Sequence, residues 1–315
     1  MKILITGAAG NLGSFLTRRM LEGPHQLNLL VHRQELPVEI TRARNTSVWW
    51  GDLDEPNTLE APCLGVDCIV HFAGKLFAPN PEGFLPITNV DYVKNLVTSA
   101  VGTGVGKFIL ISFPHVEGET DLDNPAQGLL RGNPKSVHAQ TRLDAEKHLF
   151  RACEDTSMTA VSLRAGMIYG RGVLMIDAAR RLMQRRLLGI WREPTWIHLL
   201  SLPDFLNCVL AAIEGSGIRG IYNLGDDCPL TLQTFLDKVA QHWGLKKPWR
   251  APSVIFFMAA LIVEAYASVF DTPAPLTRDF IRIGMVPYVM DTGRMRAELV
   301  SELQYPSLNE GLELL

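Results

Sequence analysis

The chain of 315 residues is 47% hydrophobic and 20% charged, which is enough apolar side chain for one large α/β unit or two unequal lobes. Its 30 Lys and Arg residues nearly balance 33 Asp and Glu residues, which argues against nucleic acid or an anionic membrane as the main partner. The densest basic cluster, Arg180-Arg181 with Arg185-Arg186, has helical spacing and indicates a solvated helix face.

The first half of the chain alternates short β-rich runs with helical stretches, which is the pattern of βαβ units. The β-rich runs are continuously apolar, as in parallel strands that are covered on both faces. The predicted strands are residues 2–6, 27–31, 47–50, 68–72, 108–112 and 159–163, and the predicted helices are 14–22, 90–101 and 138–152. We therefore predict a Rossmann-type, doubly wound parallel α/β sheet in a dinucleotide-binding domain of residues 1–165.

Residues 166–315 are less regular and are expected to form a smaller C-terminal lobe that binds substrate over the carboxyl edge of the sheet. A strand at 220–225 and a helix at 231–243 are predicted there, and some elements are expected to return to the sheet. The apolar run 254–263 continues to residue 270 with Glu264 as its only charge. It is too short to span a bilayer. We expect a helix that is buried or faces another subunit of a homodimer, with attachment to a lipid surface as the alternative.

The segment Thr6-Gly7-Ala8-Ala9-Gly10-Asn11-Leu12-Gly13 lies between the first predicted strand and the first predicted helix. Gly7 allows the tight bend, Gly10 lets the backbone approach a phosphate, and Gly13 lets the helix lie close to the strand. The helix that begins near Leu12 directs free N–H groups and its positive dipole end at the same point. The segment predicts the binding site for the pyrophosphate of a dinucleotide.

In this context the sequence resembles the extended, epimerase/dehydratase-like branch of the short-chain dehydrogenase/reductase superfamily. The resemblance runs over nearly the whole chain and begins with the glycine turn. The other matching segments are Gly51-Asp52-Leu53, His71-Phe72-Ala73-Gly74, Asn89-Val90 with Asn95-Leu96, Arg164-Ala165-Gly166-Met167-Ile168-Tyr169-Gly170, Tyr222-Asn223-Leu224-Gly225 and Asp291-Thr292-x-Arg294. The resemblance implies that Asp52 and Leu53 meet the adenine ring and that Phe72, Ala73 and Gly74 line the cofactor.

The end of the second strand decides which cofactor is expected. An acidic residue there would bind the ribose 2′-hydroxyl of NAD and repel a 2′-phosphate. The chain instead has Val31-His32-Arg33, with no carboxylate until Glu35. Because a guanidinium pairs well with phosphate, we predict NADP(H) in preference to NAD(H), with Arg33 as the main contact and His32 assisting. A merely solvated Arg33 is the alternative.

The resemblance also implies where the catalytic groups lie, and there the chain departs from the family. The family uses a Tyr-x-x-x-Lys pair on one helix face and a serine near the end of the fifth strand. The stretch Leu143-x-Ala145-Glu146 sets the register, so His138 occupies the tyrosine position and Arg142 the lysine position. Phe113 aligns with the serine, and Ser112 comes one residue earlier.

Two functions follow from this departure. In the first, the protein is an oxidoreductase or epimerase/dehydratase-like enzyme for a carbonyl or hydroxyl of a small organic substrate. His138 then exchanges the proton, Arg142 binds the cofactor and favours neutral His138 by its charge, and Ser112, His115 and Glu117 orient substrate. In the second, the protein is a catalytically silent sensor or structural protein that binds NADP(H) and acts through a protein partner.

The remaining side chains give weaker expectations. Five aromatic, histidine and methionine residues of the second lobe either face an apolar substrate or pack in the core: Met175, Met183, Trp191, Trp196 and His198. The five cysteines include no Cys-x-x-Cys pair, the histidines no metal-binding cluster, and the N-terminus no signal peptide. We therefore expect no metal site and a cytoplasmic protein with reduced thiols.

Overall fold

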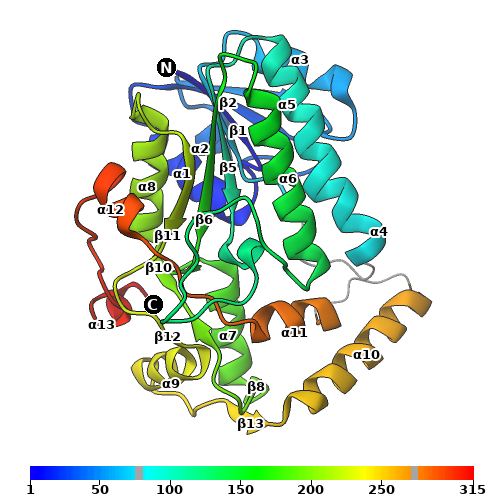
Figure 1. Ribbon diagram of the computed structural model, residues 1–315, viewed down its shortest axis with the longest axis vertical. Helices are drawn as coiled ribbons and strands as arrows, with labels where there is room; N and C mark the ends of the chain where they lie inside the picture. Colours follow the sequence, from blue (N-terminus) through cyan, green and yellow to red (C-terminus); the bar gives the residue numbers. More distant parts are fainter. Residues whose placement is uncertain (75–80, 271–275) are drawn as a thin grey trace.

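A seven-stranded parallel sheet forms the centre of the molecule, in a computed structural model that describes residues 1–74, 81–270 and 276–315 (Figure 1). The strand order is β3-β2-β1-β4-β5-β6-β11, and it reverses direction between β1 and β4. This is the doubly wound order of the Rossmann fold, which confirms the predicted fold class. The strands are β1 (Lys2–Thr6), β2 (Gln26–Val31), β3 (Thr46–Trp50), β4 (Cys68–His71), β5 (Lys107–Ser112), β6 (Thr159–Ala165) and β11 (Gly220–Leu224).

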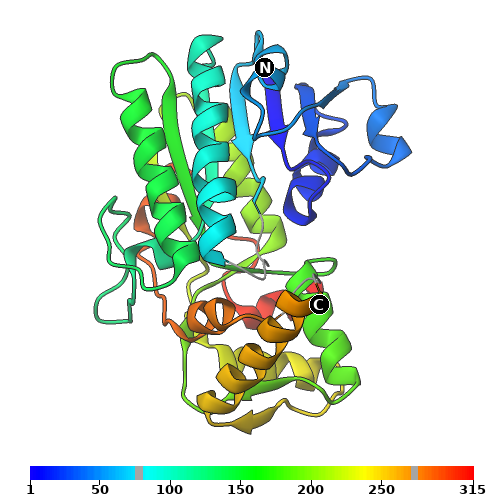
Figure 2. The same ribbon diagram turned by 90° about the vertical axis from the view of Figure 1, so that its right-hand side faces the viewer.

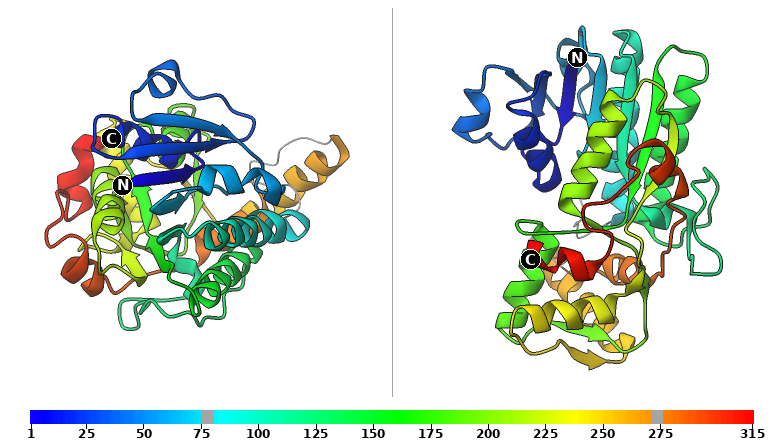
Figure 3. Two further views of the ribbon diagram at one scale, coloured as in Figure 1. Left: turned by 90° about the horizontal axis from the view of Figure 1, so that it is seen from above. Right: turned by 90° about the vertical axis from the view of Figure 1, so that its left-hand side faces the viewer.

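Helices cover both faces of this sheet, as Figures 2 and 3 show. Successive strand side chains point to opposite faces, so Ile3 and Ile5 enter one apolar cluster and Leu4 the other. The first cluster includes side chains of α1 (Asn11–Met20), α2 (Val38–Thr41) and α8 (Leu202–Glu214). The second includes side chains of α3 (Glu60–Cys63), α5 (Tyr92–Gly102) and α6 (Val137–Cys153). Both faces are therefore buried, which is why the strands are apolar throughout.

The other elements of the first half are short. They are α4 (Pro81–Leu85), the π-helical turn η2 (Pro86–Asp91) that runs into α5, and the 3₁₀ turns η1 (Pro56–Thr58) and η3 (Pro114–Glu117). The six strands predicted in the first half, and the later strand that returns to the sheet, are all found with small differences at their ends. Continuous apolar runs bounded by turns were therefore a sufficient signal for this sheet.

The second lobe lies beyond the carboxyl ends of the strands and is built from helices and three two-stranded pairs (Figure 1). The pairs are β7 (Met167–Tyr169) with β10 (Leu199–Ser201), β8 (Gly189–Trp191) with β13 (Trp249–Ala251), and β9 (Trp196–Ile197) with β12 (Leu230–Thr231). The helices are α7 (Leu174–Gln184), α9 (Leu232–His242), α10 (Ser253–Phe270), α11 (Arg278–Met285), α12 (Gly293–Glu298) and α13 (Leu308–Gly311), followed by the 3₁₀ turn η4 (Leu312–Leu314).

Helix α10 was predicted as a helix that is buried or faces another subunit, and the expectation of burial is wrong. Ala260 and Ala267 on its inner side are 0% and 2% exposed, but Ile262 on its outer side is 66% exposed. The helix packs through one side only, against α11 and β8. An apolar run predicts helical burial only when other elements are available to cover every side. Among the described residues, no helix combines the length and the apolar character needed to cross a membrane.

A buried lysine joins the two halves of the chain. Lys107, in β5, donates from Nζ to the carbonyl oxygens of Ala212 at 2.7 Å, Ile213 at 3.2 Å and Gly215 at 2.7 Å. These carbonyls belong to the C-terminal end of α8, where intrahelical donors run out and the dipole is negative. The cation therefore satisfies three acceptors and holds α8 against the sheet.

Candidate cofactor and catalytic site

The glycine turn after β1 is in close contact with the backbone that follows β4 and with the start of α1. Gly7 has a φ of +71°, and a Cβ there would lie 2.9 Å from the amide nitrogen of Ala73. A Cβ on Gly13 would lie 2.2 Å from the carbonyl oxygen of Gly7, and one on Gly10 would lie 3.0 Å from the same oxygen. Helix α1 begins at Asn11, so its free N–H groups and positive dipole end face this turn. The turn has the geometry of an anion-binding helix terminus.

The side chain of Asn11 joins the turn to the second lobe. Its Nδ2 donates to the carbonyl oxygen of Gly172 at 2.8 Å, and its Oδ1 accepts from the amide of Leu174 at 2.9 Å. The neighbouring Leu12 packs its side chain partly buried against the main core. Any contact of these two residues with a pyrophosphate is therefore left to their backbone N–H groups.

At the other end of the site, charges of both signs lie beyond β2 and β3. The Arg33 side chain is exposed, and His32 Nε2 lies 3.1 Å from an Asp52 carboxylate oxygen. The backbone of Asp52 exchanges two hydrogen bonds of 3.0 Å with the Thr58 hydroxyl, while the carbonyl of Leu53 accepts from Asn95 at 2.8 Å. The loop that the resemblance assigns to the adenine is thus fixed by two side chains.

The segment after β4 forms the wall between the glycine turn and α6. The ring of Phe72 meets that of Phe205 edge-on, with centroids 6.2 Å apart. A Cβ on Gly74 would lie 3.0 Å from Arg142 Nη2 and 3.9 Å from Asn89 Oδ1. Glycine at this position therefore allows the Arg142 guanidinium to approach the backbone that runs beside the turn.

Helix α6 presents His138 and Arg142 on one face, because residues four apart lie one above the other. The helix begins after Ser136, whose hydroxyl accepts from the amide of Ala139 at 3.2 Å as an N-cap. His138 is 5% exposed and Arg142 8% exposed. Both polar groups are therefore held inside the protein rather than in solvent.

Burial sets the charge states of this pair. It lowers the pKa of His138 to about 3, and the positive charge of Arg142 and the nearby His115 lower it further. Burial also lowers the pKa of Arg142 to about 10, an effect that Glu146 opposes. At neutral pH the imidazole of His138 is uncharged and the guanidinium of Arg142 is charged.

The ring of Phe113 packs on His138. These two rings meet edge-on with centroids 5.0 Å apart, and Phe113 is tilted against His115 with centroids 5.1 Å apart. His115 in turn packs on Tyr288 with centroids 4.4 Å apart. Ser112 is buried, and successive residues of an extended chain point to opposite sides. The structure brings Phe113 against His138, and Ser112 Oγ has no hydrogen-bond partner among the described residues.

Several buried polar atoms near the carboxyl ends of β4 and β5 have no hydrogen-bond partner among the described residues. They are His71 Nε2, Asn89 Oδ1, Ser112 Oγ and Arg142 Nε. Buried polar atoms without a partner cost about 1–3 kcal/mol each, so they are rare in folded proteins and gather where a ligand supplies the missing bonds. The cluster lies where open α/β sheets bind their ligands.

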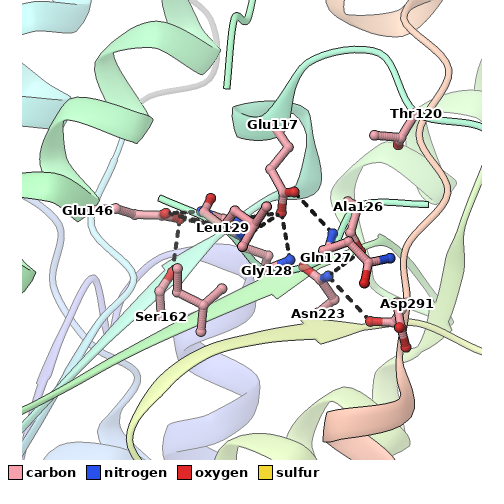
Figure 4. A network of polar contacts seen from close by, with 12 residues as sticks. Glu117, Thr120, Ala126, Gln127, Gly128, Leu129, Glu146, Ser162, Asn223 and Asp291 are labelled. Atoms are coloured by element: carbon pink, nitrogen blue, oxygen red, sulfur yellow. Dashed lines mark hydrogen bonds and ion pairs between the residues drawn. The ribbon is translucent and has the colours of Figure 1, made fainter. Parts of the chain in front are cut away.

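A buried ion triad joins α6 to β6, and Figure 4 shows two of its members, Glu117 and Glu146. Arg164 in β6 lies 2.5 Å from carboxylate oxygens of both Glu146 and Glu117 and is 0% exposed. Glu117 also accepts from the amides of residues 127, 128 and 129 at 3.0, 2.8 and 3.1 Å. Glu117, one of the residues expected to orient substrate, therefore binds Arg164 and this loop through its carboxylate. The triad fixes α6, β6 and the loop 127–129 relative to one another.

The sequence profile of the NAD dependent epimerase/dehydratase family matches residues 3–225. The chain belongs to this family. The resemblance found in the sequence is thereby confirmed.

Two relatives and one solved structure indicate which members of the family this chain is similar to. A ceramide reductase of Caulobacter vibrioides is 33% identical over 86% of this chain and 80% of its own. A 2-alkyl-3-oxoalkanoate reductase of Stenotrophomonas maltophilia is 29% identical over 80% of this chain and 79% of its own. The UDP-glucose 4-epimerase of Thermotoga maritima has the same fold, with a TM-score of 0.78 at 20% identity over 100% and 97% of the two chains.

Residues outside the family motifs complete the site, and sequence analysis missed them. Asp279 of α11 accepts from the amide of Val137 at 3.2 Å and so binds the N-terminus of α6. The carbonyl of Ile283, also in α11, lies 3.1 Å from His115 Nε2. Both contacts join residues more than 140 positions apart, so no local pattern could have shown them.

The aromatic and sulfur-containing residues of the second lobe mostly belong to the core. Trp191 and Met183 are buried in the main apolar cluster, and the Trp191 indole donates to Thr195 at 2.7 Å. His198 is 3% exposed and bonds to backbone atoms of Asp226 and Met290. The alternative of core packing is therefore correct for these three residues. Within the described ranges, no group of three His, Cys, Asp or Glu side chains is placed to hold a metal ion.

Proposed function

We propose that the protein is a nicotinamide-dinucleotide-dependent oxidoreductase that interconverts a carbonyl and a hydroxyl group on an apolar small molecule. The observation that carries this proposal is the buried pair on α6. Arg142 lies against Gly74, beside the segment that touches the glycine turn, and its Nε has no partner among the described residues. A buried cation is costly unless a ligand or a counter-charge meets it, so its retention there favours a binding role.

The residues present fit a nicotinamide dinucleotide. The N–H groups of the turn at residues 7–13 would hold the pyrophosphate, Asp52 and Leu53 the adenine, and Phe72 to Gly74 the central part. Arg142 and the unpartnered Asn89 Oδ1 would bind the ribose next to the nicotinamide. When bound, the cofactor supplies or accepts the hydride.

We assign the preference for NADP(H) to Arg33. Its exposed guanidinium follows β2, where a 2′-phosphate would come, and a guanidinium pairs with phosphate in two parallel hydrogen bonds. The Asp52 carboxylate is the opposing charge, and His32 Nε2 lies 3.1 Å from one of its oxygens. The expected discrimination is therefore modest, and NADH binds as well, but more weakly.

His138 transfers the proton, and Arg142 stabilises the developing charge. During oxidation neutral His138 would accept the hydroxyl proton as the hydride leaves the carbon for the cofactor, and during reduction the imidazole would first take up a proton from solvent and return it to the oxygen as the hydride arrives at the carbon. Arg142 stays charged and stabilises the negative charge that develops on that oxygen. The ring of Phe113 packs on His138, which is 5% exposed, and the low exposure to water strengthens both interactions. Arg142 replaces the charge of the family's lysine but cannot itself transfer a proton at neutral pH.

An apolar substrate is favoured over a nucleotide sugar. Phe113 stands where the family has a polar serine, so the pocket wall next to His138 is aromatic. The two reductases to which the chain is similar have names that specify a ceramide and an alkyl-substituted oxoalkanoate. Long-chain oxo acids and aryl ketones are therefore the first compounds to assay.

The first experiment is a fluorescence titration of the purified protein with NADPH and with NADH. Saturable energy transfer from tryptophan to NADPH, with weaker binding of NADH, is the expected result. The variant Arg33→Ala should remove the difference between the two cofactors. Equal affinities that this variant leaves unchanged would refute the assignment to Arg33.

The second experiment measures turnover of the ketone panel. His138→Ala should reduce kcat by about 10²–10⁴-fold, the usual contribution of a positioned acid–base group. His148→Ala is the matched control, because His148 lies on the same helix and is only partly buried. Unchanged turnover in His138→Ala would remove this residue from the mechanism.

A catalytically silent cofactor-binding protein is the second candidate. The observation that favours it is the contact of Phe113 with His138, because an aromatic ring covers the residue that should meet substrate. In that case NADPH binds with the same affinity to the wild type and to His138→Ala, and no ketone of the panel is reduced. A pull-down with and without NADPH then identifies the partner.

A further inference from the structure

The outer side of α10 is an apolar stripe that no other part of the described chain covers. Its main members are Val254, Ile255, Met258, Leu261 and Ile262, which are 61%, 49%, 55%, 43% and 66% exposed. Their spacing places them on one side of the helix. A helix of 18 residues is about 27 Å long, so the stripe forms a continuous surface rather than scattered single residues. Figure 2 shows α10 at the outside of the second lobe.

The single charge of α10 is turned away from this stripe. Glu264 has a side chain only 13% exposed, and it binds both the amide and the Nε of Arg278 at 2.6 Å. The helix is thereby fixed to the N-terminus of α11, while its outer side keeps no charged group. A solvated helix would show the opposite arrangement, with the charge outward and the apolar side chains inward.

The stripe continues onto the β8–β13 pair at the end of the molecule far from the N-terminus (Figure 1). Trp249, 46% exposed, stacks on Phe256 of α10 with ring centroids 5.3 Å apart. Leu187, directly before β8, is 62% exposed. The apolar surface therefore extends beyond one helix and includes an exposed tryptophan, a residue suited to the boundary between water and lipid.

Exposed cations lie close in sequence to the two members of this surface that are outside α10. Arg185 and Arg186 directly precede Leu187, Arg181 lies one helical turn earlier in α7, and Lys246 lies three residues before Trp249. Within the described residues none of these four pairs with a carboxylate. The net charge of −3 thus hides a local excess of positive charge at this end of the chain. Apolar side chains between free cations are the pattern of a surface that meets anionic lipid.

We propose that α10, together with Leu187 and Trp249, docks the protein onto the surface of an anionic lipid bilayer, with α10 lying in the plane of the interface. A second copy of the chain is a poorer occupant, because two-fold pairing through this face would bring the same arginines together. The proposal does not depend on the proposed enzymatic function, since it concerns a surface outside the site.

The test is flotation of the full chain with vesicles of phosphatidylcholine, with and without phosphatidylglycerol. The wild type should float with the anionic vesicles, and added salt should weaken this binding. The variant Ile255→Ser/Met258→Ser/Ile262→Ser should lower the bound-to-free ratio at least tenfold. The control Val38→Ser/Leu64→Ser/Leu122→Ser changes three side chains of similar exposure in the first half and should bind as the wild type does.

Two further measurements separate lipid from other occupants. Brominated lipids should quench tryptophan fluorescence in the wild type and quench it less in Trp249→Phe, whereas Arg181→Gln/Arg185→Gln should weaken binding and its dependence on salt. The proposal is overturned if the wild type does not float, or if the triple serine variant floats equally well. It is also overturned if sedimentation shows a dimer that the triple serine variant converts to monomer.

Discussion

Replacement of Arg164 by methionine tests the buried triad that supports α6. The variant removes the cation from between Glu117 and Glu146 and leaves the Glu146 carboxylate, 0% exposed, with the Ser162 hydroxyl at 2.9 Å as its one remaining hydrogen-bond donor among the described residues. Glu117 suffers less, because three backbone amides still bind it. Breaking a buried pair by removing one partner costs about 3–5 kcal/mol. At roughly 2–4 °C per kcal/mol, the midpoint of thermal unfolding should fall by about 6–20 °C.

A second substitution identifies the cause of this loss. The double variant Arg164→Met/Glu146→Leu removes both charges and should be more stable than Arg164→Met alone. Urea unfolding followed by circular dichroism measures the free energy of unfolding of both variants. A loss below about 1 kcal/mol, or a double variant as unstable as the sum of the singles, would refute the reasoning.

Three further predictions concern the site. Burial lowers the pKa values of three histidines, to about 3, about 4 and about 3 for His71, His115 and His138, so the unfolded chain takes up protons first. The free energy of unfolding should therefore be constant above about pH 6.5 and fall by roughly 1.4 kcal/mol per histidine and pH unit below it. Urea unfolding at successively lower pH that shows no such loss would contradict this. Gly13→Ala places a Cβ 2.2 Å from the Gly7 carbonyl oxygen and should weaken NADPH binding at least tenfold in the same fluorescence titration, whereas Gly102→Ala meets nothing within 4 Å and should leave it unchanged. Ser136→Ala removes the N-cap of α6 and should cost about 1 kcal/mol in thermal unfolding, and a neutral effect would show that the cap is dispensable.

The sheet and the glycine turn were predictable because their signals are local. Each strand is an apolar run bounded by turn residues, and the bend at Gly7 requires a residue that accepts a positive φ. The helix of His138 and Arg142 was predictable for the same reason, since its N-cap and its apolar spacing lie within the segment. The resemblance to a family placed Gly74 and Arg142 at the cofactor, and their contact with each other was found only in the structure.

The parts that sequence analysis missed depend on contacts between distant segments. Asp279 binds the N-terminus of α6 across more than 140 residues, and nothing around Asp279 marks it as a partner of that helix. An apolar or aromatic residue such as Trp191 has the same sequence signal whether it lines a pocket or fills a core. In the same way, the composition of α10 predicts an apolar helix but not which of its sides is left uncovered.

The lysine that holds α8 has a consequence for synthesis of the chain. A ribosome that has produced only the first 165 residues has made six strands of the sheet, but β6 then lacks its neighbour β11 and Lys107 lacks the carbonyls of residues 212–215. An unpaired strand edge and a buried amine without acceptors both disfavour a stable intermediate. Until residues 212–224 have been synthesised, β6 is therefore an unpaired edge strand and Lys107 lacks its acceptors.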